Sequence, residues 1–195
     1  MGRQGIVSIN DRARDNLRYI RETMERAGSF TAVPGWGGVY MGISALAASW
    51  IASRMLSRDR WFAVWVGEAL LAFAIGFWAM IHKAKTARVF LKGPGRAFAL
   101  SLFPAMFAGT VLTLVLYRHG IFSLLPGLWM LLYGVAVVSG GTNSVRIVPV
   151  LGMSFIVFGT LALALGPEWA NIEMAMGFGM LHVVFGVLIA RRYGG

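Results

Sequence analysis

The chain has 195 residues, of which 57% are hydrophobic and 13% are charged, and its mean hydropathy is +0.68. A soluble domain of this length could not bury so much apolar surface, so the composition predicts a membrane protein. The net charge of +10 does not indicate nucleic-acid binding, because the basic residues lie at the ends of apolar segments. The absence of cysteine excludes disulfides, thiol catalysis and cysteine-ligated metals.

The first predicted element is a cytoplasmic amphipathic helix within residues 1–30. Apolar side chains recur there at steps of 4, 3, 4 and 3 residues, which favours a helix with a narrow apolar stripe. The stripe consists of Ala13, Leu17, Ile20, Met24 and Ala27. The helix either packs on the bundle, which the shortness of the pattern favours, or docks a protein partner or a second copy of the chain. Five arginines against four acids between residues 9 and 27 make it a poor anchor for anionic lipid.

The region 31–195 contains six segments of about 20 residues that are uncharged or carry a single carboxylate, the length that a spanning helix needs. We therefore expect an all-α polytopic membrane protein, a bundle of six transmembrane helices in the lipid bilayer. The expected spans are about 37–53, 61–81, 97–117, 120–141, 147–166 and 170–190.

Lysine and arginine are divided unequally between the two sides of this bundle. The N-terminal region, the loop after the second span, the loop after the fourth span and the C-terminus together hold 14 of these residues, and the other loops hold 4. Positive charge is retained on the cytoplasmic side of membranes, so both termini should be cytoplasmic.

One carboxylate, Glu68, interrupts the second span. At steps of 4, 4 and 3 residues it shares a helix face with Ala72, Gly76 and Ala79, and large apolar residues such as Leu70 lie opposite. Small residues let another helix come close, so this face should be turned into the bundle. An unpaired, charged carboxylate is energetically unfavourable inside the membrane, so we expect Glu68 to be neutral at pH 7.

His182 lies on a similar small-residue face of the sixth span. From the rise of a helix, Glu68 should lie about 11 Å and His182 about 18 Å below the outer boundary of the membrane. Other polar residues of the spans should form two loose layers. Those expected near His182 are Tyr133, Ser154 and Ser44, and those expected near Glu68 are Thr110 and Thr160.

The candidate intramembrane polar site therefore comprises Glu68, His182, Tyr133, Thr110 and Ser154. These side chains either join helices by hydrogen bonds or form a proton relay or substrate site. Other chemistries have little support. The three histidines lie at different depths, no Ser/His/Asp arrangement or H-E-x-x-H motif occurs, and we expect no metal, no cofactor and no enzymatic activity.

Several stretches resemble a family of small bacterial multipass membrane proteins for which no activity is established. The similar stretches are DRARDNLRYIRETMERAGSFTAVPGWGGVYMGISALAAS, GPGRAFALS, LLPGLWMLLYG and GFGMLHVVFGVLIARRYGG. The resemblance implies a setting in the bacterial inner membrane and implies nothing about catalysis.

We expect a non-enzymatic accessory, regulatory or scaffold protein of the inner membrane. The alternative is a small-solute or proton-coupled transporter that uses Glu68 and His182, and a third class is an intramembrane enzyme. The first two differ in one structural respect, which is whether Glu68 and His182 line an aqueous cavity or sit in dry packing.

Overall fold

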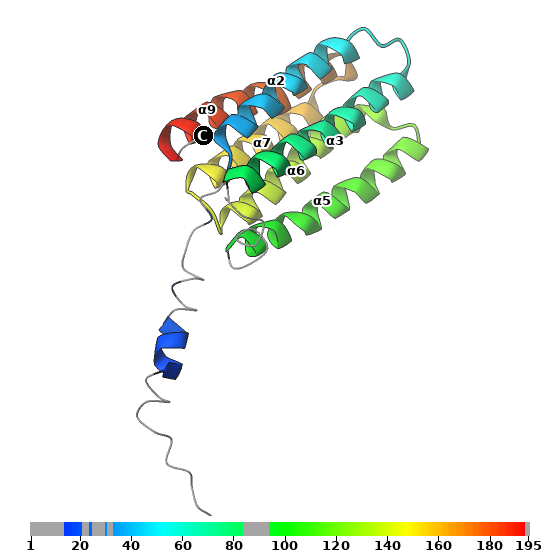
Figure 1. The fold of residues 1–195 in the computed structure, drawn as a ribbon. Helices are drawn as coiled ribbons and strands as arrows, with labels where there is room; N and C mark the ends of the chain where they lie inside the picture. The colour runs from blue at the N-terminus through cyan, green and yellow to red at the C-terminus, as the bar shows by residue number, and fades with distance from the viewer. Residues whose placement is uncertain (1–13, 21–23, 25–29, 31–32, 84–93, 194–195) are drawn as a thin grey trace, which may run out of the picture.

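The computed structural model describes residues 14–20, 24, 30, 33–83 and 94–193, and these residues are almost entirely helical (Figure 1). The long helices are α2 (Gly35–Ala52), α3 (Arg58–Lys83), α5 (Pro94–Arg118), α6 (Leu125–Gly141) and α7 (Ile147–Ala164). The last membrane segment runs through α8 (Ala170–Met174), the π-helix η3 (Ala175–Leu181) and α9 (His182–Tyr193). Two short 3₁₀ turns, η1 (Phe122–Leu124) and η2 (Pro167–Trp169), precede α6 and α8.

Five helices in the described part of the chain are long and apolar enough to cross a membrane. They are Arg58–Lys83, Gly95–Arg118, Phe122–Gly141, Ile147–Ala164 and Pro167–Tyr193. This confirms an all-α protein with membrane-spanning character. The remaining expected span, 37–53, forms helix α2, which is not among the five. Its four glycines, two tryptophans and two serines lower its hydropathy.

Glycine and proline set several of the helix ends. Gly120 has a φ of +70°, a left-handed conformation that turns the chain out of α5 and into η1. Pro126 occupies the first turn of α6, where its missing N–H leaves no hydrogen bond unmade. Helix α5 continues through Pro104, which lies inside it.

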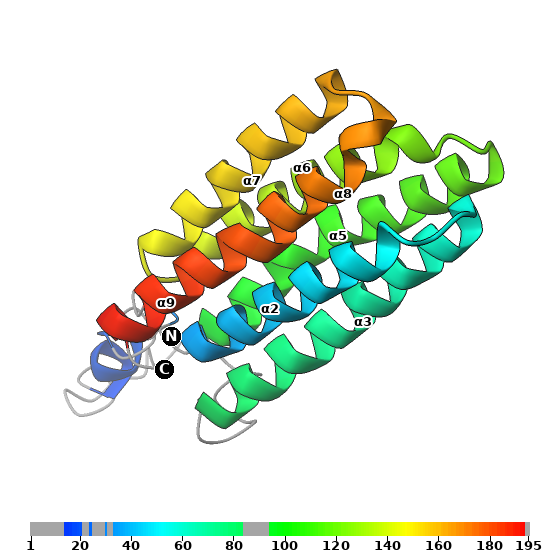
Figure 2. The same ribbon diagram turned by 90° about the horizontal axis from the view of Figure 1, so that it is seen from above.

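The helices form two groups of three. In Figure 2, α2 lies between α3 and α9, and the contacts between elements place α6 between α5 and α7. The core between the groups contains the fully buried Met130 of α6 and Phe155 of α7, and Phe178 and Phe185 of the last segment pack against it. His182, one of the candidate polar residues, lies against the aromatic rings of this core.

The most extensive contacts in the bundle are those of α6 with α7 and those of α2 with the last membrane segment, which comprises η3 and α9. Glycines lie at both contacts. A Cβ atom built on Gly42 would lie 2.6 Å from the carbonyl oxygen of Gly179. One built on Gly134 would lie 2.7 Å from the carbonyl oxygen of Gly152. The backbones therefore touch at positions where no larger residue fits without moving the helices apart.

Phe30 attaches the segment before α2 to the turn between α6 and α7. Its N–H donates to the carbonyl oxygen of Asn143 at 2.7 Å, and the Ser144 hydroxyl donates to its carbonyl oxygen at 2.7 Å. Its buried ring lies 5.1 Å from the ring of Phe98 at the start of α5. The chain is thus fixed to the bundle at residue 30.

Lys83, the last residue of α3, joins three parts of the same end of the bundle. Its Nζ atom donates to the carbonyl oxygen of Val33, just before α2, at 3.0 Å. It also donates to the carbonyl oxygen of Tyr193, the last residue of α9, at 3.0 Å. The start of α2 and the end of α9 therefore lie at one end of the molecule.

Candidate intramembrane polar sites

The small-residue face of α3 is turned toward α2. Glu68 on this face is 8% exposed, and its Oε1 lies 2.8 Å from the hydroxyl oxygen of Ser44 on α2. Further along the same face, a Cβ atom on Gly37 would meet the Cβ of Ala79 at 2.7 Å, so α2 and α3 touch there as well. The opposite face of α3 is exposed, and Leu70 is 68% accessible.

The Ser44 hydroxyl has two neighbours that can accept a hydrogen bond. It lies 2.8 Å from Glu68 Oε1 and 2.9 Å from the carbonyl oxygen of Met41. A hydroxyl carries one hydrogen, so it cannot donate fully to both. The Ser44 hydroxyl donates to Glu68 Oε1 of the neighbouring helix and lies at a similar distance from the carbonyl oxygen of its own turn, so its one hydrogen is shared between the two acceptors.

His182 uses both ring nitrogens inside the aromatic core. Its Nδ1 lies 2.9 Å from the carbonyl oxygen of Phe178, one turn earlier, and its Nε2 lies 2.8 Å from the hydroxyl of Tyr133 on α6. A carbonyl can only accept, so Nδ1 carries a hydrogen, and in the neutral ring Nε2 accepts from the Tyr133 hydroxyl. The ring of Phe155 lies 5.2 Å from the imidazole, and His182 is 6% exposed.

The hydrogen bond between Tyr133 and His182 joins the two groups of helices. Tyr133 belongs to α6, in the group with α5 and α7, and His182 begins α9, in the group with α2 and α3. The π-helix η3 ends directly before His182. Segments of this kind are rare and often accompany functional positions. Nothing in the sequence AMGFGML predicted it.

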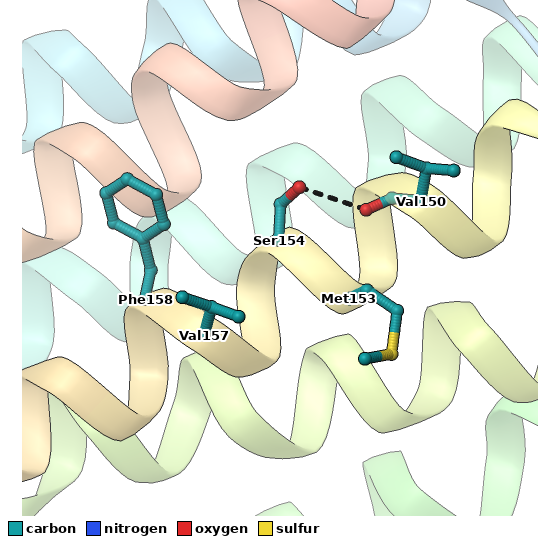
Figure 3. Close-up of a pocket in the computed structure, with 5 residues that line it drawn as sticks. All are labelled: Val150, Met153, Ser154, Val157 and Phe158. Atoms are coloured by element: carbon teal, nitrogen blue, oxygen red, sulfur yellow. Dashed lines mark hydrogen bonds between the residues drawn. The ribbon is translucent and has the colours of Figure 1, made fainter.

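The other predicted site residues do not join either pair. Thr110 donates to the carbonyl oxygen of Met106 on its own helix at 3.0 Å. Ser154 does the same to Val150 at 3.0 Å, as Figure 3 shows. Thr160, also expected near Glu68, donates to its own helix as well. Hydroxyls that donate to their own helix in this way do not link helices.

Two open grooves lie on the outside of the bundle. One, of about 280 Å³, is lined by Val150, Met153, Ser154, Val157 and Phe158 of α7 (Figure 3). The other, of about 560 Å³, runs between α2 and α3 and is lined by Tyr40, Ile43, Ser44, Ala47, Ala74, Ile75 and Trp78. Neither lining includes Glu68 or His182. Ser44, which contacts Glu68, lines the second groove.

A polar cluster at the other end of the bundle was missed by the sequence analysis. The side-chain oxygen of Asn171 accepts a hydrogen bond from the Trp61 indole N–H at 2.8 Å. The backbone carbonyl oxygen of Asn171 accepts one from the Ser49 hydroxyl at 2.7 Å. Trp61 stacks on Trp129 at 5.9 Å. Tryptophans at the ends of spans are expected at the membrane interface in any case, and a single asparagine there does not indicate a partner. The sequence therefore did not predict this contact.

The N-terminal stripe is described in part. Residues 14–20 are helical, and Leu17, Ile20 and Met24 are 66%, 51% and 70% exposed. Ala13 and Ala27 lie outside the described residues. The three described members of the stripe are therefore not covered by the bundle.

A comparison of the chain with known protein families, with curated proteins and with solved structures finds no match.

Proposed function

We propose that this chain is a non-enzymatic accessory or scaffold protein of the bacterial inner membrane. One observation carries the proposal: the two buried ionisable side chains of the bundle, Glu68 and His182, are each satisfied by an adjacent helix or by their own turn. Groups used in this way hold helices together. They are not left available to bind a substrate or to pass a proton onward.

The separation of the two sites supports the same proposal. Glu68 contacts α2, whereas His182 contacts α6, and α2 lies between α3 and α9 (Figure 2). A relay from Glu68 to His182 would have to pass the contact between α2 and the last segment. There the backbones touch at Gly42 and Gly179.

We further propose that α2 is the sixth span and that both termini are cytoplasmic. Lys83 bonds to Val33 before α2 and to Tyr193 at the end of α9, so the chain enters and leaves the bundle at one end. An even number of crossings satisfies this arrangement, and α2 supplies the crossing that the five apolar helices lack. The excess of basic residues at this end supports a cytoplasmic assignment.

In this proposal the N-terminal helix carries the accessory role, since its stripe is exposed while Glu68 and His182 are hydrogen-bonded within the bundle. The test compares Ile20→Asp, on the stripe, with Tyr19→Asp, one residue away and about 100° around the helix from Ile20. Crosslinking in native membranes measures the assembly of the protein with itself or with a partner. We expect crosslinked products to disappear in Ile20→Asp and to persist in Tyr19→Asp. Both variants should insert normally, because the spans carry their own insertion energy. Unchanged assembly in Ile20→Asp would overturn the docking role.

The second candidate remains a proton-coupled or small-solute transporter. The observation in its favour is the π-helix that ends at His182, because such segments can rearrange at working sites. Proton-coupled uptake in liposomes that is abolished by Glu68→Gln, in a protein that still folds, would favour this candidate, since an amide cannot release a proton.

A further inference from the structure

We propose that the groove between α2 and α3 binds an acyl chain of an anionic phospholipid, with the lipid phosphate at the basic end of the bundle. The inference rests on the membrane-spanning arrangement proposed above, in which this end faces the cytoplasm, and it adds a lipid ligand. It is drawn from the lining of the groove, its orientation along the helices and the distribution of charge between the two ends of the bundle.

The groove is an apolar hollow on the outside of the bundle. It measures about 560 Å³, and the small side chains of Ser44, Ala47 and Ala74 leave this space between the exposed Tyr40 and Trp78. The hydrogen of the Ser44 hydroxyl is already shared between Glu68 and the backbone of its own turn. The hollow therefore suits an apolar chain, which in a membrane-spanning protein is the chain of a lipid.

The groove opens toward the end of the bundle that contains Lys83. A Cβ atom on Gly37 would meet Ala79, and one on Gly76 would lie 3.1 Å from the sulfur of Met41, so α2 and α3 run in opposite directions. Tyr40 and Trp78 therefore lie at the same level, one to two turns from the end of α3. Aromatic residues with a polar edge are favoured at the membrane interface, where a lipid chain joins its headgroup.

Positive charge is concentrated at this end of the bundle. In residues 33–83 and 94–193, the carboxylates Asp59, Glu168 and Glu173 lie at the opposite end, and Glu68 lies within a span. The basic residues at the groove end are Lys83, Arg96, Arg146, Arg191 and Arg192.

The rest of the chain has the same sign of charge. By sequence, residues 1–32 contain six arginines against four acids, and residues 84–93 contain three basic residues and no acid. Clusters of this sign beside the spans attract anionic headgroups in preference to zwitterionic ones. Lys83 is the basic residue nearest to the groove along α3, and its bond to the carbonyl oxygen of Tyr193 brings the arginines that precede Tyr193 close to it.

The dimensions of the groove favour a lipid chain over a protein helix. From Tyr40 to Ala47 it extends about 10 Å, or two helical turns. A helix is itself about 10 Å across and is too wide to enter a hollow of this length between two adjacent helices. Two copies of the chain related by a two-fold axis at this groove would set hollow against hollow and leave the space unfilled.

The experiment uses the full chain in nanodiscs of phosphatidylcholine with a small fraction of phosphatidylglycerol that carries a photoreactive diazirine on one acyl chain. Mass spectrometry of the peptides locates the adducts. We expect them to concentrate on residues 40–47 and 74–78. Unlabelled phosphatidylglycerol should displace them at a roughly fivefold lower mole fraction than phosphatidylcholine, and this difference should shrink at about 1 M salt.

Matched variants separate the groove from the surrounding lipid-facing surface. Ala74→Leu fills the hollow from α3 and Ala47→Leu fills it from α2, and each should remove most of the adducts. Ala69→Leu adds the same volume at an exposed position of α3 that does not line the groove, and it should leave them unchanged.

A second pair of variants tests the headgroup. Arg191→Gln combined with Arg192→Gln removes two charges from the groove end and should reduce the preference for phosphatidylglycerol. Arg58→Gln combined with Arg60→Gln removes two charges from the opposite end and should not.

Three results would overturn the inference. Adducts spread evenly over the exposed helices, and unchanged in Ala74→Leu and Ala47→Leu, would show ordinary surrounding lipid only. Equal displacement by the two lipids would remove the anionic headgroup. Crosslinks between copies of the chain at residues 40–47 would make a second copy the occupant. A nanodisc exposes both ends of the protein alike, so these results test the lipid, and a failure of the proposed orientation appears only in topology reporters.

Discussion

Hydrogen bonding separates the polar residues of the spans into two kinds. Thr110 and Ser154 bond to carbonyl groups of their own helices. The pairs of Ser44 with Glu68 and of Tyr133 with His182 instead connect different helices. Only the second kind resists separation of the helices, so replacements at the two kinds of position should differ in their effect on stability.

Replacement of Glu68 tests the first interhelical pair. Glu68→Gln keeps the shape and a hydrogen-bonding group, and its free energy of unfolding should stay near that of the wild type. Glu68→Ala should lose roughly 1 kcal/mol, the scale of an interhelical hydrogen bond in membranes. Thr110→Val, which removes only a bond within one helix, is the control. Unfolding in mixed micelles by titration with dodecyl sulfate gives these free energies, and equal losses for Gln and Ala would contradict the role.

Replacement of Tyr133 tests the second pair. Tyr133→Phe keeps the ring in the aromatic core and leaves His182 Nε2 without its donor, which should again cost about 1 kcal/mol. Tyr40→Phe removes a hydroxyl from a tyrosine that is mostly exposed, and it should have little effect. The same titration compares the two variants, and equal stability would show that the Tyr133 hydroxyl does not hold the helix groups together.

The sequence predicted the orientation of the polar residues better than their partners. The spacing of small residues correctly turned the Glu68 face toward a neighbouring helix, since Gly37 and Ala79 meet there. Depth along straight spans grouped Ser44 with His182, whereas Ser44 contacts Glu68. Depth along the membrane does not determine which helices are neighbours. The π-helix before His182 also changes the local rise, and local propensity does not reveal it.

At the scale of the elements, close glycine contacts set the packing. Small residues in a sequence indicate that some helix comes close, but they do not identify it. The structure pairs α2 with α9 and α6 with α7, and it leaves α3 and α5 on the outside. Helices α6 and α7 are consecutive, but α2 and α9 are far apart in the chain, and no local pattern in α2 or α9 specifies the other.

Alanine at a contact glycine should separate α2 from α9. In Gly42→Ala the new Cβ would lie 2.6 Å from the carbonyl oxygen of Gly179 and 2.8 Å from the backbone nitrogen of Val183. We expect a loss of about 1–3 kcal/mol in the free energy of unfolding, because backbone atoms cannot move aside as side chains do. Gly67→Ala on α3 meets nothing within 4 Å and should be neutral or slightly stabilising. Similar stabilities for the two variants would argue against the glycine contact.

At the scale of the whole molecule, the all-α membrane architecture followed from composition and from the lengths of the uncharged segments. The first expected span is the exception. Helix α2 is not among the five helices long and apolar enough to cross a membrane, and its glycines and serines make contacts with α3 and with the last segment. A hydropathy scale scores transfer to lipid, and a helix surrounded by other helices need not satisfy that measure.

Topology reporters test the six-span arrangement. Fusions after Gly195 and within residues 84–93 should report cytoplasm, and a fusion near Arg58 should report the outside. The physical reason is the retention of basic loops on the cytoplasmic side, together with an even number of crossings. A C-terminal fusion that is exported would contradict the arrangement.

The central claim is that the buried polar groups sit in dry packing and join helices. The chain has no cysteine, so a single introduced thiol reports water access without background. Ser44→Cys places that thiol beside Glu68, and Leu56→Cys places it at a fully exposed position between α2 and α3. In sealed vesicles, a membrane-impermeant thiol reagent applied in turn to each side should label Leu56→Cys from one side and Ser44→Cys from neither. Labelling of Ser44→Cys at a rate comparable to that of Leu56→Cys would reveal an aqueous path to Glu68 and would contradict the account.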